Sequence, residues 1–451
     1  MKTIGHKEAV CLVAEGDKVS PEKRQELQNQ RLHELVDYAR ANSPYFAQLY
    51  ADLPENYTLK DLPPTQKSIL NDHYEDWVTD RRITLEMVEE FVSRDSSDNR
   101  RLLDEYTGLK TSGSTGKSLP VLRDEHRNLI HGELMNQRLF GSVDPELLNP
   151  SKHRMAYIIH VSFGASSYNG FIRMRSVSPD RMNNMKAISV MESIDKIVEE
   201  LNEFQPETIV GYPSSLMLLA NEKERGTLNI PVKLIGSSSE NLPESTHHRL
   251  EKVFGCKVIN NYCMTEGGEI AMTRNCAHLH LNEDWIIVEP VHADMTPMEN
   301  DEEFSEGILV TDLANFVQPF IRYYVGDRVR IRKSDCDQCS LPILEVQGRT
   351  AVPFSICGTK YTSMVFVSKA EVWPGLITYQ VVQTSDDTIQ LRGICAPDSK
   401  PEEVLGSLAA KMQEYFHENG APGAKITWSA EPLIHNKRGG KTPQYINISN
   451  L

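Results

Sequence analysis

Short apolar runs alternate with amphipathic runs through the middle of the chain. Between residues 155 and 344, runs rich in Val and Ile cover 155–161, 207–213, 232–239, 257–262, 285–291 and 307–313. Between several of them, apolar residues recur with the 3.6-residue period of a helix, over 194–203, 215–224 and 243–253. Strands that alternate with helices predict an α/β fold, in which ligands bind at the carboxyl ends of the strands.

The pattern differs at the two ends of the chain. Over 20–41, Ser20 and Pro21 precede an apolar stripe, which predicts a helix with a serine cap. After Arg349, strand patterns and a helical pattern over about 401–418 predict a small α+β unit. We therefore predict a large α/β domain with mixed sheets and flanking helices over 1–348, followed by a small, mobile α+β domain over 349–451.

Composition narrows the classes of function. The formal net charge of −15 at pH 7 argues against nonspecific nucleic-acid binding, which needs Lys and Arg to neutralise phosphates. No window approaches the roughly 20 apolar residues of a membrane-spanning helix, and the first apolar run is too short for a signal peptide. Eight cysteines in 451 residues do not suggest a disulfide framework. These features predict a cytoplasmic protein that binds neither nucleic acid nor membrane and carries free thiols or a metal site.

A segment rich in hydroxyl groups precedes the region of alternating strands and helices. It consists of Thr111, Ser112, Gly113, Ser114, Thr115, Gly116 and Lys117. The glycines let the backbone approach a ligand, and the hydroxyls, amides and ammonium can donate to anionic oxygens. The P-loop pattern fails because Thr111 replaces its first glycine, and because residues 101–110 offer no buried strand before the loop. A phosphate-binding loop and a flexible surface linker remain as alternatives.

Further polar motifs each follow or end an apolar run. They cover 236–240, 261–266, 319–323 with Gly326 and Asp327, 348–349 and 438–441. In order and spacing, these motifs and the hydroxyl-rich loop resemble the adenylate-forming superfamily of acyl-CoA synthetases, adenylation domains and luciferases. Within it, the chain is similar to the phenylacetate–CoA ligase branch. The resemblance extends over nearly the whole chain, and it rests on six motifs in order rather than on any one of them.

The resemblance implies a site for ATP. Residues 111–117 would cradle the β- and γ-phosphates, Tyr262 would stack on adenine, and Asp327 would accept from the ribose hydroxyls. Thr265 would donate to the α-phosphate and Glu266 would hold Mg²⁺. The remaining nucleotide contacts would come from Ser238, Ser239, Glu240, Asn261, Cys263, Met264 and Arg349. From the residues alone, a core tyrosine is an equal alternative for Tyr262, and the Thr–Glu pair would be a helix start and the Gly–Asp pair a turn.

The same resemblance implies that Lys441 is the catalytic cation, acting together with Thr265 and Glu266. Its ammonium would stabilise the charge that develops as a carboxylate attacks the α-phosphate. Outside this context, a lysine in the basic segment 435–441 would be an ordinary solvated side chain.

The acid would bind near the ends of three strand patterns. The residues concerned are His160, Phe163, Gly211, Tyr212, Pro213 and Gly236. A structural histidine is an equal alternative for His160. The resemblance favours an aromatic or arylalkyl acid.

A cluster of potential metal ligands lies outside these motifs. Cys276 and His280 are four residues apart, and Cys336 and Cys339 form a CxxC pair. Three thiolates and one imidazole suit a closed, tetrahedral structural zinc site, with His278 as a competing ligand. Some members of the phenylacetate–CoA ligase branch look similar here. The alternative is a set of reduced side chains on loops.

The chain departs from the family where an acidic hinge residue is expected after Gly348 and Arg349. Thr350, Ala351 and Val352 follow instead. The acceptor therefore stays open between coenzyme A, an amine and a carrier-protein thiol, and no segment suggests a binding site for coenzyme A. We predict an acid–thiol ligase, with an amide synthetase, a non-catalytic nucleotide-binding homologue and a P-loop phosphotransferase as alternatives. Homodimer formation is left open.

Overall fold

The computed structural model describes residues 4–94, 100–111, 119–149, 151–161, 165–176, 178–190, 192, 194–298, 302–349, 353–362, 366, 373–435, 442–443 and 445–447. Among these residues, no helix has the length and apolar character that crossing a bilayer requires.

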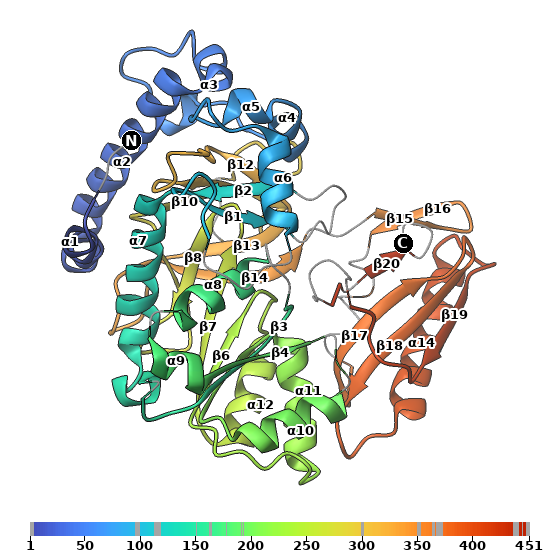
Figure 1. The fold of residues 1–451 in the computed structure, drawn as a ribbon. Helices are drawn as coiled ribbons and strands as arrows, with labels where there is room; N and C mark the ends of the chain where they lie inside the picture. The colour runs from blue at the N-terminus through green and yellow to red at the C-terminus, as the bar shows by residue number, and fades with distance from the viewer. Residues whose placement is uncertain are drawn as a thin grey trace.

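A nine-stranded mixed sheet forms the centre of the region over 1–348, which we predict to be the large domain (Figure 1). Its strand order is β13-β14-β9-β8-β7-β6-β5-β3-β4. The parallel half contains β3 (Met155–Ile159), β4 (Met185–Ser189), β5 (Thr208–Gly211), β6 (Leu234–Ser238) and β7 (Lys257–Met264). The antiparallel half contains β8 (Gly268–Thr273), β9 (Leu279–Leu281), β13 (Asp327–Arg332) and β14 (Ile343–Arg349). The predicted α/β class with mixed sheets is confirmed.

Helices lie beside the parallel half and, apart from the short helix Pro179–Asn184, contribute residues to the apolar core that its strands form. They are α8 (Ser166–Arg175), α9 (Pro179–Asn184), α10 (Ile194–Phe204), α11 (Pro213–Glu224) and α12 (Glu244–Phe254). Leu201, Leu216 and Leu250 of the last three are fully buried against the strands. The three helices expected from the periodicity therefore form within a few residues of the predicted bounds.

Helices also open the chain. They are α1 (His6–Lys18), α2 (Pro21–Asn42), α3 (Pro44–Leu49), η1 (Leu59–Asp61), α4 (Lys67–Asp72), α5 (Tyr74–Trp77) and α6 (Leu85–Ser93). The Ser20 hydroxyl accepts from the Lys23 amide at 3.3 Å, which confirms the predicted cap of α2. A second apolar core forms between α2 to α6 and the segment around Phe320, whereas Ala9 and Val13 of α1 lie in a third core.

A short hairpin brackets the hydroxyl-rich loop. Strand β1 (Thr107–Lys110) pairs antiparallel with β2 (Pro120–Arg123), and Gly108 and Leu109 are buried. The expectation that no buried strand precedes the loop was wrong. The P-loop is still excluded, because a P-loop leads from its strand into a helix, whereas this loop returns as the next strand of a hairpin.

The chain continues from this hairpin through α7 (Glu125–Glu133), η2 (Leu134–Leu139), η3 (Phe140–Ser142) and η4 (Pro145–Leu148). Farther along the chain, β10 (Ile286–Val291), β11 (Gly307–Asp312) and β12 (Tyr323–Val325) form a three-stranded antiparallel sheet.

The C-terminal strands form a sheet of their own, in the order β19-β18-β17-β20. Its elements are β17 (Leu376–Gln383), β18 (Thr388–Cys395), α14 (Pro401–Glu418), β19 (Lys425–Ser429) and β20 (Tyr445–Asn447), preceded by the hairpin of β15 (Pro353–Ile356) and β16 (Thr359–Thr362). Met412 and Phe416 of α14 are fully buried in a separate core. Ile377 of β17 packs against the core of the parallel half, and Figure 1 shows the C-terminal sheet beside α11.

Candidate active site

Four adjacent parallel strands end at one edge of the large sheet. His160 follows β3, Tyr212 follows β5, Ser239 and Glu240 follow β6, and Thr265 follows β7. Because β3, β5, β6 and β7 are neighbours in this order, their carboxyl ends lie side by side. The sheet topology thus gathers site residues that are spread over more than a hundred positions in the sequence.

The two residues expected to contact adenine and ribose meet directly. The Tyr262 hydroxyl donates to Asp327 Oδ2 at 2.6 Å. Tyr262 is in β7 and Asp327 begins β13, and three strands separate β7 from β13 in the sheet. Neighbouring strands are roughly 4.8 Å apart, so a flat sheet would hold the two residues too far apart for contact. The antiparallel half must therefore curve back towards β7.

Arg349 belongs to the same corner of the site. It is the register partner of Asp327 between β13 and β14, so its backbone lies opposite the aspartate. The side chain of Arg349 lies outside the described residues, as do residues 112–117, Phe163 and Lys441. Thr111 is buried beside the loop, and its hydroxyl accepts from the Leu119 amide at 2.9 Å.

The turn after β7 is held by an arginine that the sequence analysis missed. Arg123, the last residue of β2, donates from Nη2 to the Thr265 carbonyl at 3.1 Å. Burial, and then the nearby charge of Arg127, lower the pKa of Arg123 to about 10, which still leaves it cationic at neutral pH. Arg123 thus joins the strand that follows the hydroxyl-rich loop to the segment carrying Thr265 and Glu266. The available signal in the sequence was an arginine directly after the apolar run 119–122.

Some of the residues expected beside the acid allow close packing of the strand ends, and others make hydrogen bonds. A Cβ on Gly211 would lie 3.2 Å from Ser215 Oγ, and a Cβ on Gly236 would lie 3.1 Å from Val210 Cγ2. Glycine at these two positions therefore permits close packing around the strand ends. Tyr212 is buried, and its hydroxyl accepts from the His160 amide at 3.1 Å. Pro213 opens α11 and sets the direction of the chain away from β5.

His160 Nδ1 is buried and has no hydrogen-bond partner among the described residues. Burial, followed by the charge of Lys110, lowers the pKa of His160, so its imidazole is neutral at neutral pH. Ser237 Oγ and Asn261 Oδ1, in β6 and β7, are buried atoms that likewise lack a partner within the described part of the chain. Buried polar atoms of this kind are rare in proteins, and a bound ligand or water is a common explanation for them.

The loop after β6 contains a strained residue. Ser239 has a φ of 71°, a backbone conformation that favours glycine. The Ser238 hydroxyl lies 3.3 Å from Ser239 Oγ and 3.4 Å from Cys263 Sγ, where Cys263 precedes Met264 at the end of β7. Strain held in place by surrounding structure is a frequent feature of ligand-binding loops.

Three of the four proposed zinc ligands lie together. The ligand atoms of Cys276, His280 and Cys336 are all within 4.8 Å of one another, and this group does not include Cys339. His280 Nδ1 lies 2.8 Å from the Leu341 carbonyl. Because a carbonyl only accepts, Nδ1 carries the proton, which leaves Nε2 bare and 3.1 Å from Cys276 Sγ.

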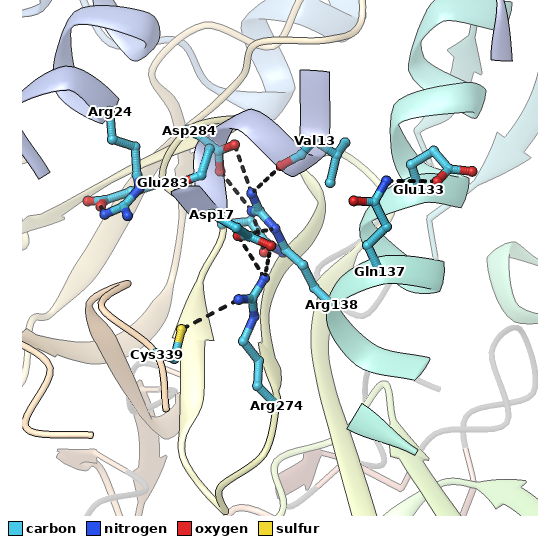
Figure 2. A network of polar contacts seen from close by, with 12 residues as sticks. Val13, Asp17, Arg24, Glu133, Gln137, Arg138, Arg274, Glu283, Asp284 and Cys339 are labelled. Atoms are coloured by element: carbon cyan, nitrogen blue, oxygen red, sulfur yellow. Dashed lines mark hydrogen bonds and ion pairs between the residues drawn. The ribbon is translucent and has the colours of Figure 1, made fainter. Parts of the chain in front are cut away.

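A buried network of charges connects Cys339, the fourth proposed zinc ligand, to the first helix (Figure 2). Arg138 donates to both carboxylate oxygens of Asp284, at 2.7 and 2.8 Å, and its Nε lies 3.1 Å from Asp17 of α1. Arg274 donates to Asp17 at 2.9 Å and to Cys339 Sγ at 3.7 Å. We call Asp17, Arg138, Arg274 and Asp284 the Arg138 network.

Comparison with known proteins shows what the chain is similar to. Residues 97–291, which contain the hydroxyl-rich loop and the ends of β3 to β7, match the family of AMP-binding enzymes. This match relates residues 97–291 to the adenylate-forming superfamily that the sequence motifs resemble. It is similar to phenylacetate-coenzyme A ligase of Thermus thermophilus, with 24% identity over 468 residues that cover 95% of this chain and 97% of the relative. It is also similar to Protein CapK of Staphylococcus aureus, with 20% identity over 415 residues that cover 87% of this chain and 83% of that protein.

Solved structures give the same fold. A crystal structure of 2-hydroxyisobutyryl-CoA ligase in the postadenylation state, in complex with 2-HIB-AMP, matches 96% of this chain and 91% of that chain with a TM-score of 0.67 and 16% identity. The same ligase in the thioesterification state, with 2-HIB-AMP and CoA, matches equal shares with a TM-score of 0.58 and 17% identity. The adenylate-forming fold therefore extends over nearly the whole chain.

Proposed function

We propose that this adenylate-forming enzyme is an AMP-forming acid–thiol ligase. It activates an aromatic or arylalkyl carboxylic acid as an acyl-adenylate, releases pyrophosphate and transfers the acyl group to coenzyme A. The observation that carries the proposal is the edge formed by β3, β5, β6 and β7, where Tyr262 and Asp327 are hydrogen-bonded to each other. The aromatic acid and the coenzyme A acceptor are supported by the similarity to phenylacetate-coenzyme A ligase.

ATP would be bound along the ends of β6 and β7. The ring of Tyr262 is oriented by its bond to Asp327, whose carboxylate would also accept from the ribose. Residues 111–117 would hold the β- and γ-phosphates. Ser238, Ser239, Asn261, Cys263 and Met264 would line the nucleotide, with Arg349 at the junction with the C-terminal domain, for which we propose a boundary at residue 349.

Charge at the reacting centre would be met by three residues. Thr265 would donate to the α-phosphate, and the carbonyl of Thr265 is fixed by Arg123. The partly buried carboxylate of Glu266 fits Mg²⁺, which binds proteins through one or two carboxylates and completes its shell with phosphate oxygens and water. Lys441 would approach the α-phosphate and the attacking carboxylate, and stabilise the charge that develops between them.

The acid would lie between the ends of β3 and β5. Its carboxylate would be aligned by the neutral His160, whose buried Nδ1 lacks a partner among the described residues. Phe163, Gly211, Tyr212, Pro213 and Gly236 would shape the remaining wall.

Exchange between ATP and labelled pyrophosphate, measured without an acceptor, tests the first half-reaction. A panel of aromatic, arylalkyl and aliphatic acids should give exchange with the aromatic or arylalkyl members. Coenzyme A and small amines are then compared as acceptors with the active acid, and coenzyme A should give the thioester. No exchange with any acid, despite measurable ATP binding, would contradict the proposal. Product with amines alone would establish an amide synthetase instead.

We also propose a structural zinc site at Cys276, His280, Cys336 and Cys339. The geometry of the first three supports it, because the bare Nε2 of His280 faces two thiols. Arg274 supports a thiolate at Cys339, to which it donates. The site would fix the loops that carry it and take no part in the reaction.

Metal analysis of the purified protein should find about one zinc per chain, as expected for a single four-ligand site. A chelator should lower the melting temperature. Cys336→Ser should lose the metal, whereas Cys357→Ser, at an exposed cysteine elsewhere, should retain it. Protein that contains no metal and is insensitive to the chelator would rule the zinc site out.

A further inference from the structure

The carboxylate of Glu240 connects two parts of the chain that are 202 residues apart. Glu240 Oε2 accepts from the Ser214 amide at 3.0 Å, in the first turn of α11. Glu240 Oε1 accepts from the Thr442 amide at 3.1 Å. We call these two hydrogen bonds the Glu240 bridge. The Thr442 hydroxyl lies 3.4 Å from Ser214 Oγ and 3.0 Å from His435 Nδ1, so its side chain also faces this junction.

The two hydrogen bonds of the Glu240 bridge differ in whether they depend on the position of the C-terminal segment. Ser214 and Glu240 both belong to the large domain, and the amide of Ser214 is at the positive end of the α11 dipole, which favours a carboxylate. Thr442 belongs to the C-terminal segment. The bond to Ser214 therefore holds the carboxylate in place, while the bond to Thr442 forms only when the C-terminal segment lies against the ends of β5 and β6.

The amide that Glu240 accepts from is part of the peptide bond between Lys441 and Thr442. Lys441 lies outside the described residues and directly precedes Thr442 in the sequence. A lysine side chain is long and flexible, so the place its ammonium can reach depends on how firmly its backbone is held.

We propose that Glu240 is a positioning residue for adenylation, which acts by fixing the backbone on the C-terminal side of Lys441. The inference rests on the proposed function, because it concerns the lysine that serves the first half-reaction. In that step the ammonium faces the charge of both the acid and the α-phosphate. When the acyl group passes to a thiol, the pyrophosphate has already left and the charge of the acid has been lost in the acyl–phosphate bond, so that only the charge of the α-phosphate remains. The Glu240 bridge therefore serves adenylate formation and is dispensable for acyl transfer.

The experiment compares the two half-reactions in Glu240→Ala, using phenylacetate as the probe acid. Loss of a hydrogen bond to a charged group corresponds to roughly a 10- to 100-fold change in rate, so pyrophosphate exchange should fall by about that factor. The transfer of preformed phenylacetyl-adenylate to coenzyme A should stay within about twofold of the wild type. Glu240→Gln retains one acceptor oxygen and should recover part of the exchange rate.

Three further variants isolate the contact. Thr442→Pro removes the donated amide and should reproduce the loss of exchange. Thr442→Ala keeps the amide and should have a smaller effect. Glu244→Ala removes an exposed acid from the first turn of α12, four residues from Glu240, and should leave both half-reactions unchanged.

Hydrogen exchange tests the bridge without any substrate. The Thr442 amide should be protected in the wild type and lose its protection in Glu240→Ala. An unprotected amide in the wild type, an unchanged exchange rate in Glu240→Ala, or equal slowing of both half-reactions would each overturn the inference. A wild type that protects this amide but activates no acid would instead contradict the proposed function.

Discussion

In the Arg138 network each charged side chain faces an opposite charge, whereas at the ends of β3, β6 and β7 three buried polar atoms face no partner among the described residues. Both regions lie in the large domain, and both take polar groups out of water. A paired group is compensated within the protein and serves the fold. An unpaired group such as His160 Nδ1 or Asn261 Oδ1 leaves a hydrogen bond to be made by something else, which is the property expected of a binding site.

The largest effect should come from breaking the paired region. Asp284→Ala removes the carboxylate that receives two hydrogen bonds from the fully buried Arg138. Loss of one partner of a buried ion pair typically reduces stability by about 3–5 kcal/mol. We expect a clearly lower melting temperature and denaturant midpoint. Glu55→Ala, at an exposed acid, should change stability by about 0.5 kcal/mol or less. Equal stability of the two variants would mean that the network contributes nothing.

Acid should weaken the same region. Burial acts to raise the pKa of Asp284, but Arg138 outweighs it and the pKa ends below its ordinary value; Glu269 is lowered in the same way by His131 and Arg127. The unfolded chain therefore binds these protons first. The stabilisation is complete above the unfolded pKa of about 4 and is lost as the pH falls through the lower native values. The free energy of unfolding should fall more steeply with decreasing pH below about pH 4. In Asp284→Ala the slope of that fall should be shallower.

Among variants of the proposed active site, the largest loss of activity should come from Lys441, the proposed catalytic cation. Lys441→Ala should reduce pyrophosphate exchange about a hundredfold or more, because a well-placed charge contributes on the order of 3 kcal/mol to transition-state stabilisation. The melting temperature should not change. Lys437→Ala alters a lysine in the same basic segment and should keep normal exchange. Full activity in Lys441→Ala would refute the assignment.

A smaller effect on activity is expected from the contact between Tyr262 and Asp327, which we propose orients the nucleotide. Tyr262→Phe removes the hydroxyl bound to Asp327 and keeps the ring for stacking. A hydrogen bond of this kind contributes about 1 kcal/mol, so the KM for ATP should rise roughly fivefold with little change in kcat. Steady-state kinetics with saturating acid measures both constants. A fall in kcat at constant KM would place Tyr262 at the reacting centre rather than at the adenine.

Local patterns predicted most of the regular elements. The helical pattern over 401–418 corresponds to α14, because Pro401 starts the helix and its apolar residues recur with a helical period. The strands β3, β5, β6 and β7 coincide with predicted runs rich in Val and Ile. Strand β1 was missed because it is four residues long and includes Gly108, which has little strand preference.

The candidate site was predictable as a set of residues, but the contacts within it were not. The pairing of Tyr262 with Asp327 depends on the curvature of the antiparallel half of the sheet, which no local pattern encodes. The Glu240 bridge joins positions 202 residues apart, and Arg123 meets Thr265 across 142 residues. Contacts at such separations are set by tertiary packing. Sequence motifs could therefore indicate which residues belong together, but not which atoms meet.

The contact between Asp17 and Arg274 also constrains the order of events during synthesis. The two residues are 257 positions apart, and at about 5–20 residues per second the ribosome needs roughly 10–50 s to add that length. During this interval Asp17 of α1 has emerged and its partner Arg138 is made, while its other partner, Arg274, has not yet been made. The helix buries little apolar surface of its own, namely Ala9, Val13 and Gly16. The ion pair between Asp17 and Arg274 therefore forms only after β8 has been made, whereas the packing partners of α1 in α7 and η2 emerge much earlier.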